Sequence, residues 1–140
     1  MAEVHDLTIA KLARASGVNR ETIRFYEARG LLAAPPRSAS GYRLYALSDA
    51  RRVRFIRVAQ ALGFTLEEIG ELLTLRGSPN GTCGIVQSKA MEKIAQIDRK
   101  IKALTDMKAV LVEVASECSG GSSPIEECPI LSALDRKADT

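Results

Sequence analysis

The chain has 140 residues, of which 46% are apolar and 26% are charged, and its formal net charge is +3. This composition is typical of one or two small folded domains and excludes a disordered chain. No apolar run approaches the ~18 residues that span a bilayer, and the N-terminus lacks the apolar segment of a signal peptide. We therefore expect a cytoplasmic protein. In that reducing compartment its three cysteines are free thiols, which serve as buried filler, redox groups or metal ligands.

The first thirty residues predict two short helices joined by a tight turn. Thr8 is a favoured helix N-cap, and the apolar residues after it recur at helical spacing until Ser16-Gly17 ends the helix. Asn19 then caps a second helix, Arg20–Arg29, which carries several arginines. A short helix, a turn and an Arg-bearing second helix predict a helix-turn-helix, with an ordinary helical hairpin as the alternative.

A small β-hairpin, or wing, is predicted after these helices, over residues 33–45. Two consecutive prolines exclude a helix there, and Ser40-Gly41 is a turn signal. The alternating run that follows predicts a short strand, which places Arg43 on one face with Tyr42 and Tyr45 close by.

Two further helices are predicted to complete a domain over residues 1–75. Ser48-Asp49 is the expected N-cap of a third helix, Ala50–Leu62. Thr65 and Glu68 form a T-x-x-E capping box at the start of the fourth helix. The apolar faces of these two helices should close the core of the domain.

Arginine dominates the charge of this domain, since nine arginines and only three acids lie between Arg20 and Arg57. The planar guanidinium donates two hydrogen bonds at once, which suits phosphate recognition. Together with the helix-turn-helix, the arginines favour DNA as the partner. The alternatives for any one arginine are a solvated side chain or an ion pair with Glu21 or Glu27.

A long helix is predicted from Ile85 to Ala115, after a linker at residues 76–84, because neither Gly nor Pro interrupts it. An apolar seam in alternating steps of four and three residues runs along it, as in a coiled coil. The seam consists of Ala90, Ile94, Ile97, Ile101 and Leu104 and continues, slightly rotated, with Met107, Val110, Leu111 and Val114. A second copy of the helix is the simplest partner, so we expect a homodimer. The alternative is a helix folded back on its own N-terminal domain.

The three cysteines lie beyond the N-terminal domain. Cys83 precedes the long helix, Cys118 follows it, and Cys128 opens a final short helix, Pro129–Leu134, after which we expect the tail from Asp135 to fray. A Gly/Ser loop between the last two cysteines is a poor place for buried filler, so we interpret the thiols as metal ligands. Thiolates select soft cations.

The N-terminal domain resembles the MerR family of bacterial regulators over three segments, VNRETIRFYEARGLL (Val18–Leu32), SGYRLY (Ser40–Tyr45) and RVRFIRVAQALGFTLEEIGELL (Arg52–Leu73). The cysteine pattern, with its final Cys-Pro-Ile-Leu run, resembles the metal-sensing branch of that family. The resemblance implies a promoter-bound homodimer. On binding metal it untwists and bends the DNA, so that RNA polymerase meets both promoter elements in register.

The implied fold is mainly α. A winged helix-turn-helix domain at 1–75 is followed by the 76–84 linker, a dimerisation helix at 85–117 in an antiparallel coiled coil, and a metal-binding loop and helix at 118–140. The implied DNA-contacting residues are Arg20, Thr22, Arg24, Tyr26, Tyr42, Arg43, Tyr45, Arg54 and Arg57. The implied metal ligands are Cys83 of one subunit with Cys118 and Cys128 of the other.

The choice of metal rests on the same resemblance. The family's sensors of monovalent copper, silver or gold carry serine where Cys83 stands, so this cysteine favours a divalent ion. Three thiolates favour Hg(II), with Pb(II) and Cd(II) as further candidates. The zinc-sensing branch carries an extra Cys and a His around the loop, which this chain lacks, whereas the mercury sensors have a loop one residue shorter. A zinc-responsive regulator and a thiol-based redox sensor are the alternatives. No nucleophile–base or acid pair suggests an enzyme.

Overall fold

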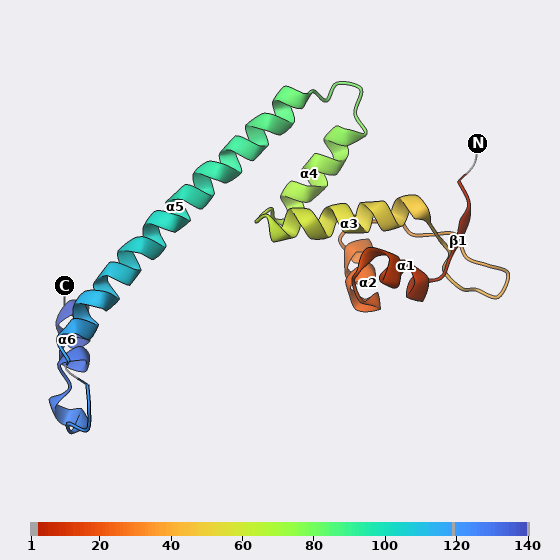
Figure 1. Ribbon diagram of the computed structural model, residues 1–140. Helices are drawn as coiled ribbons and strands as arrows, with labels where there is room; N and C mark the ends of the chain where they lie inside the picture. Colours follow the sequence, from red (N-terminus) through yellow and green to blue (C-terminus); the bar gives the residue numbers. More distant parts are fainter. Residues whose placement is uncertain (1–2, 119, 140) are drawn as a thin grey trace. The chain divides into compact units, whose positions relative to one another are not determined.

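The computed structural model describes residues 3–118 and 120–139 and is mainly helical (Figure 1). The chain divides into two compact units, one up to Ser88 and one from Lys89 onward. The first unit contains β1 (His5–Leu7), α1 (Ile9–Ser16), α2 (Arg20–Ala28), β2 (Tyr45–Ala46), α3 (Leu47–Ala61) and α4 (Leu66–Arg76). The long helix α5 (Cys83–Ser116) crosses the division, and a 3-10 turn η1 (Ile125–Glu127) and α6 (Pro129–Ala138) follow it.

Side-chain caps begin three helices of the first unit at the predicted residues. The Thr8 hydroxyl accepts from the Lys11 amide at 3.3 Å at the start of α1. Asn19 caps α2 in the same way, and Thr65 caps α4 with Glu68 in the predicted capping box. The turn after α1 is made by Gly17, whose φ of 74° lies in the left-handed region that favours glycine.

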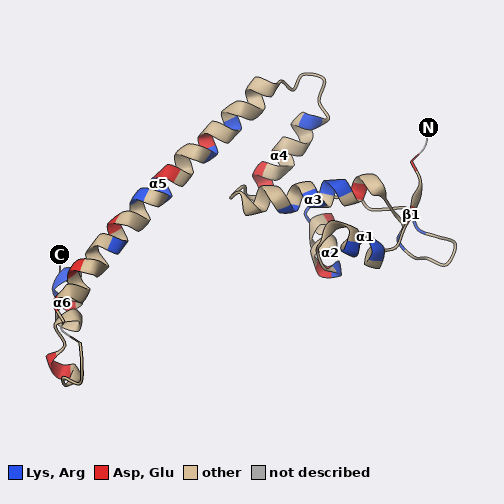
Figure 2. Cartoon of the chain, in the orientation of Figure 1, with Lys and Arg blue, Asp and Glu red and all other residues tan. Residues whose placement is uncertain are grey.

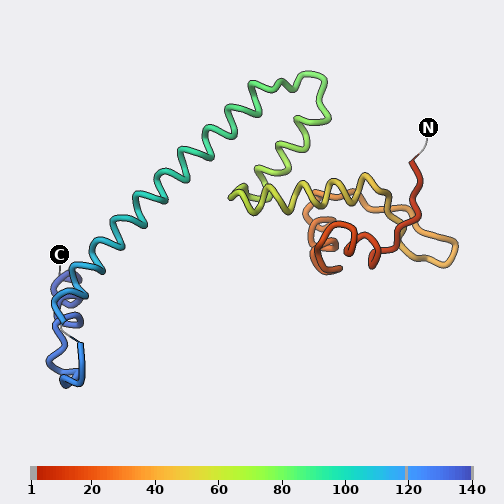
Figure 3. The backbone as a smooth tube through the Cα atoms, viewed as in Figure 1, coloured from red at the N-terminus to blue at the C-terminus, as the bar shows by residue number. Residues whose placement is uncertain are grey.

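One hydrophobic core holds these helices together. Leu12 of α1, Ile23 of α2, Val53 and Ile56 of α3 and Ile69 of α4 are fully buried in it. Figure 3 shows α1 and α2 folded close to α3, and α1 packs against both of the other two helices. The predicted helix-turn-helix is therefore confirmed as a packed unit.

The wing is smaller than predicted, because residues 33–45 contain a single antiparallel bridge, Arg37 with Arg43. The turn inside it is closed by the Ser38 amide, which donates to the Tyr42 carbonyl at 2.7 Å. The strand β2 pairs instead with β1, with Tyr45 opposite Leu7. Strand β1 was not predicted, since three residues are too few to show an alternating pattern.

Helix α3 begins at Leu47, three residues before the predicted start, and its N-cap is Ala46. Asp49 lies in its first turn, where its carboxylate accepts from the Ala46 amide at 2.9 Å. The Ser48 hydroxyl, predicted as a cap, donates to Glu3 at 2.7 Å. That hydrogen bond lowers the pKa of Glu3. Glu3, in the N-terminal segment, thus supplies a second carboxylate at the start of α3.

The second unit contains most of α5 and the C-terminal segment. Helix α6 reaches Ala138, so the prediction of a frayed tail from Asp135 was wrong for residues 135–138. Val114 and Ala133 are both buried, and Arg136 pairs with Glu117 at 3.3 Å, which holds α6 beside the end of α5. Most of the predicted seam of α5 is exposed, as for Ile101 and Leu104 at 56% and 60%.

Candidate nucleic-acid interface and metal ligands

Helix α2, the second helix of the predicted helix-turn-helix and the one expected to act as the recognition helix, carries its polar residues on an exposed face. Arg20 and Arg24 are exposed, and neither forms an ion pair among the described residues. Thr22 lies in the first turn, where both its amide and its hydroxyl donate to Asn19 Oδ1, at 2.8 and 2.7 Å. Two guanidinium groups are therefore free for an anionic partner, whereas the Thr22 hydroxyl already serves the helix cap.

Arg54 and Arg57 of α3 lie next to the turn between α1 and α2. Arg54 Nη1 donates to the Ala15 carbonyl at 2.8 Å. A Cβ atom placed on Gly17 would lie 3.6 Å from Cζ of Arg57. Both arginines thus extend the basic surface of the helix-turn-helix onto α3, and Figure 2 shows this concentration of basic residues on α1, α2 and α3.

Two of the predicted DNA-contacting tyrosines lie in the core. Tyr26 is 3% exposed, and its hydroxyl donates to Gln60 at 2.6 Å. Tyr45 is fully buried, and its hydroxyl donates to Glu27. Burial raises the pKa of Tyr26, while burial and the Glu27 carboxylate raise the pKa of Tyr45 to about 12. The alternating pattern of residues 42–45 predicted a strand but gave no sign that Tyr45 points inward.

The wing places Tyr42 and Arg43 differently. Tyr42 is 70% exposed. Arg43 is partly buried, and its Nη1 donates to Glu27 Oε2 at 3.0 Å. Of the two acids considered as partners for the arginines, Glu27 is therefore one that forms such a pair. Arg37 Nη1 donates to the Gly41 carbonyl at 2.8 Å and steadies the turn.

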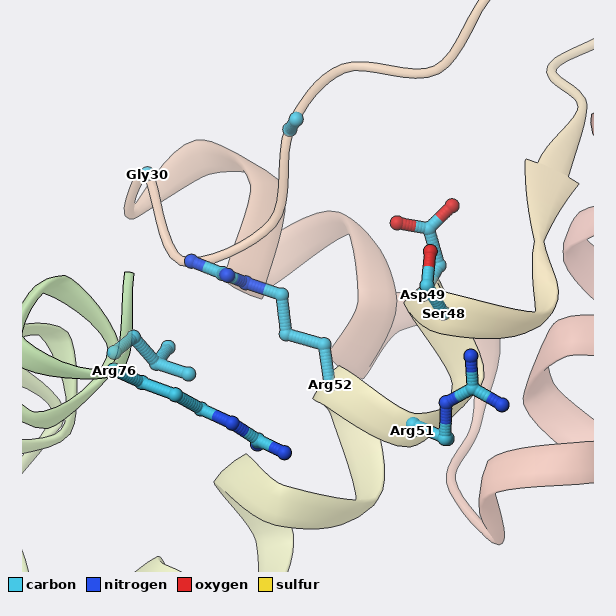
Figure 4. A pocket seen from close by; sticks show the side chains of 8 residues that line it. Gly30, Ser48, Asp49, Arg51, Arg52 and Arg76 are labelled. Atoms are coloured by element: carbon cyan, nitrogen blue, oxygen red, sulfur yellow. The ribbon is translucent and has the colours of Figure 1, made fainter. Parts of the chain in front are cut away.

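A pocket of about 480 Å³ on the first unit has a basic lining (Figure 4). Arg51 and Arg52 of α3 and Arg76 of α4 contribute to it. Arg52 Nε donates to the Leu31 carbonyl at 2.6 Å, and the Arg76 guanidinium lies 5.6 Å from the centre of the Phe55 ring. The basic surface of α3 thus continues to the end of α4, which the spacing of arginines in the sequence did not indicate.

Cys83 is the first residue of α5, two positions inside the predicted linker. Its thiol is free and exposed. It borders a pocket of about 360 Å³ whose other lining residues include Phe55, Leu72, Leu75 and Arg76. The cysteine therefore lies beside helices α3 and α4 of the first unit, at the point where α5 begins.

Cys118 and Cys128 lie at the two ends of the C-terminal loop, and both are free thiols of intermediate exposure. Cys118 follows α5 by two residues, and its Sγ accepts from the Gly120 amide at 3.3 Å. Cys128 is the N-cap residue of α6, with Pro129 in the first turn. The Glu117–Arg136 pair fixes the base of this loop.

The three thiols are not assembled within one chain. Among residues 3–118 and 120–139, no group of three or more Cys, His, Asp or Glu side chains is placed to hold a metal ion. Cys83 belongs to the first unit, and the other two cysteines belong to the second.

The described helices include none that is both long and apolar enough to cross a bilayer.

Comparisons with known proteins extend over both units. The family model "MerR HTH family regulatory protein" matches residues 7–75, and the model "MerR, DNA binding" matches residues 50–114. The HTH-type transcriptional regulator HmrR of Sinorhizobium medicae (strain WSM419) is 40% identical over 128 residues, which are 91% of this chain and 86% of that protein. A mercuric resistance operon regulatory protein of Pseudomonas fluorescens is 40% identical over 131 residues, 94% of this chain and 89% of that protein.

A solved structure is similar as well. The transcription regulator PbrR691 from Ralstonia metallidurans CH34, in complex with lead(II), has a TM-score of 0.82 and 36% sequence identity. The match covers 91% of this chain and 98% of that one.

Proposed function

The chain belongs to the MerR family of helix-turn-helix transcription regulators, and we propose that it is a metal-responsive member that acts on a promoter as a homodimer. One observation carries this proposal: a single chain combines an Arg-bearing helix-turn-helix with three free cysteines at the ends of α5 and α6. The family consists of regulators and not of enzymes. Similarity to a mercuric resistance regulator and to a lead(II)-bound regulator supports a soft metal ion as the signal.

The dimer is proposed to form along α5. This helix has 34 residues and is therefore about 50 Å long. Ile94, Ile97, Ile101 and Leu104 repeat at coiled-coil spacing, and each is 39% exposed or more. A contiguous apolar row of this size is a typical contact surface rather than a solvent-facing one. A second α5 in antiparallel orientation would cover it.

The metal ligands are proposed to come from both chains. In an antiparallel dimer the first residue of one α5 lies beside the last residues of the other. Cys83 would then join Cys118 and Cys128 of the second chain. The donor set fits a thiophilic ion, because all three cysteines are free and at least partly exposed. The Gly120 amide that donates to Cys118 would also stabilise the negative charge of that sulfur as a ligand.

The inducing metal is proposed to be Hg(II), with Pb(II) and Cd(II) as further candidates. Three thiolates leave a site with net charge −1 around a divalent ion. Hg(II) accepts three sulfurs, and Pb(II) fills its open side with a lone pair. Zinc prefers four ligands in structural sites, and no fourth group is identified here. A zinc-responsive regulator and a thiol-based redox regulator remain the alternatives, which metal content and redox titration of one sample would separate.

The DNA interface is proposed to centre on Arg20, Arg24, Arg54 and Arg57, whose side chains are exposed around the helix-turn-helix. Most of them would contact phosphates and fix the register of the protein on the duplex. Tyr42 in the wing is exposed enough to join them. Thr22, Tyr26 and Tyr45, which form internal hydrogen bonds, would instead support the interface from behind. Arg43, which is partly exposed in the wing, would join the interface at its edge.

Transcription would be controlled through the shape of the DNA. Deformation of a short duplex costs on the order of a few kcal/mol. Metal binding releases more free energy than that when it orders ligands that were separate. The regulator would therefore stay on the promoter with and without metal, and metal would change only the twist and bend of the DNA. RNA polymerase would then find both promoter elements aligned.

Mixed dimers test the shared metal site. A Cys83→Ser chain paired with a Cys118→Ser/Cys128→Ser chain has one complete set of three thiols if the ligands cross the dimer interface. The mixed dimer should hold one Hg(II) through three sulfurs against excess competing thiol, whereas the Cys83→Ser homodimer offers only the two loop thiols of one chain and should lose its Hg(II) to the competitor. Co-expression with two affinity tags followed by metal analysis measures this. A mixed dimer without tight metal would show that the three ligands do not come from two chains.

A further inference from the structure

Glu27, near the end of α2, accepts hydrogen bonds from two residues of the wing segment. Arg43 Nη1 donates to its Oε2 at 3.0 Å, and the Tyr45 hydroxyl donates to its Oε1. The Glu27 side chain is only 11% exposed. Each carboxylate oxygen therefore has its own partner, and the two partners come from a segment that begins 16 residues further along the chain.

This carboxylate connects the two elements that the DNA interface requires. Helix α2 carries Arg20 and Arg24 on its exposed face. Arg43 lies in the wing, where its backbone forms an antiparallel β-bridge with the backbone of Arg37. Through Tyr45 the same carboxylate is connected to the sheet, because Tyr45 pairs with Leu7 of β1. Glu27 therefore fixes the position of the wing relative to the recognition helix.

Arg43 keeps donors free for a further acceptor. Its side chain is 35% exposed, Nη1 donates to Glu27, and the guanidinium group also interacts with the Tyr45 hydroxyl. A guanidinium group has five N–H donors in a planar fork. It can therefore bridge a carboxylate on one side and a phosphate on the other, with its plane held by the carboxylate.

We propose that Glu27 is a positioning residue of the DNA interface. It contacts no DNA itself, but it orients the Arg43 guanidinium toward a backbone phosphate and holds the wing at a fixed place beside α2. This inference rests on the proposed function as a promoter-binding regulator. It adds a role that neither the basic residues nor the metal ligands supply.

The direction in which one substitution changes the affinity for DNA distinguishes a positioning role of Glu27 from a simple effect of its charge. A carboxylate near DNA repels phosphates, so removing its charge should by itself strengthen binding. Glu27→Gln keeps the size of the side chain and an oxygen that can accept from Tyr45. If Glu27 positions Arg43, this variant should bind the promoter roughly fivefold more weakly, as expected for the loss of a charge-assisted hydrogen bond.

Glu21→Gln is the matched control, because Glu21 lies in the first turn of the same helix and is exposed. Its promoter affinity should stay the same or increase. The proposal is overturned if Glu27→Gln also binds as tightly as the wild type or tighter. A wild-type protein that protects no promoter DNA in a footprint would instead overturn the proposed function, so the two failures are distinguishable.

A double-mutant cycle tests whether Glu27 acts through Arg43. Arg43→Gln should weaken binding and lower the salt dependence by about one counterion. Glu27→Gln should then cause no further loss in the Arg43→Gln background. Additive losses would mean that Glu27 acts independently of Arg43 and would overturn the proposal. Thermal unfolding of each variant confirms that the comparison is between folded proteins.

Arg43→Lys provides a second route should Glu27→Gln fail to fold. It keeps the positive charge but replaces the planar fork with a single ammonium group. Positioning predicts a loss of affinity close to that of Arg43→Gln. An affinity equal to that of the wild type would show that only the charge of residue 43 matters, and the proposal would be rejected.

Discussion

The backbone N–H of Gly120 donates a hydrogen bond to the Sγ of Cys118 at 3.3 Å. Gly120 and Gly121 both have positive φ, 80° and 86°, in the left-handed region that favours glycine. Glycine at these two positions therefore lets the loop turn back over the sulfur without the backbone strain that a Cβ would cause. A backbone donor beside a thiolate ligand stabilises its charge without a titratable partner.

Gly120→Ala should weaken metal binding. Alanine at this φ costs about 1 kcal/mol, which corresponds to roughly fivefold in affinity if the turn must be kept. Gly84→Ala in α5 is the control, because a Cβ there meets only Thr82 Oγ1 at 3.7 Å. Competition against a thiol chelator measures both affinities. Equal affinities of Gly120→Ala and wild type would show that metal binding does not depend on the Gly120 turn.

Cys118→Ser should separate DNA binding from metal response. The thiol lies outside the DNA-binding unit, so the promoter footprint should be retained. Metal-induced transcription should be lost, because one of three proposed ligands is missing. A footprint and an in vitro transcription assay on the same preparation check both parts. Loss of the footprint would mean that the cysteine is structural.

Replacing Ile97 and Ile101 by Asp should abolish the dimer. Both residues lie in the exposed apolar row of α5, and unpaired carboxylates cannot be buried in a helix seam at low cost. Specific promoter binding should be lost with the dimer, because two half-sites are then no longer held together. Sedimentation and footprinting measure the two effects.

The matched control introduces the same charges on the other side of α5. Ala95 and Ala103 are exposed and lie away from the row of isoleucines. Ala95→Asp/Ala103→Asp should remain dimeric. If the Ile97/Ile101 variant still sediments as a dimer, another surface holds the two chains together.

Stability should decrease in alkaline solution as Tyr45 ionises. Its pKa is raised from 10.0 to about 12 in the folded protein, so the folded state keeps a proton that the unfolded state has lost. This contribution to stability is complete below pH 10 and is lost as the pH rises through about 12. Tyr45→Phe should flatten the decrease, whereas Tyr42→Phe, at an exposed position, should not. Denaturant unfolding at a series of pH values tests the difference.

Induction should distinguish the candidate metals. Hg(II), Pb(II) or Cd(II) should activate transcription well below the zinc concentration required, because three thiolates suit soft ions and zinc prefers a fourth ligand. A reporter assay with each metal gives the order directly. Induction by zinc at the lowest concentration would favour the zinc-responsive alternative.

Local signals predicted much of the fold. Caps at Thr8, Asn19 and Thr65 mark helix starts through contacts only three residues long, so the sequence displays them. The start of α3 was misplaced because Ser48 hydrogen-bonds Glu3, a partner 45 residues away. The short strand β1 was missed for a related reason, since the strand it pairs with, β2, lies far along the chain.

The sequence predicted which residues make up the candidate site, but it did not predict the contacts between them. The arginines and cysteines could be named from residue type and spacing, and the resemblance to the family placed them on elements. Alternation places Tyr42 and Tyr45 on opposite faces but does not say which face is buried; Tyr45 is fully buried and Tyr42 is exposed. Which arginine pairs with Glu27 depends on the packing of the wing against α2, which no local pattern encodes.

The contacts between the end of α5 and α6, which join the two ends of the C-terminal loop, affect how fast a metal ion can bind there. Burial of Val114 and Ala133 and the Glu117–Arg136 pair bring the ends of the loop together before any ion arrives. The entropic cost of closing the loop is therefore part of folding and does not arise again when a metal ion binds. Binding of a metal ion by the thiols of this loop would therefore not require its two ends to be brought together first.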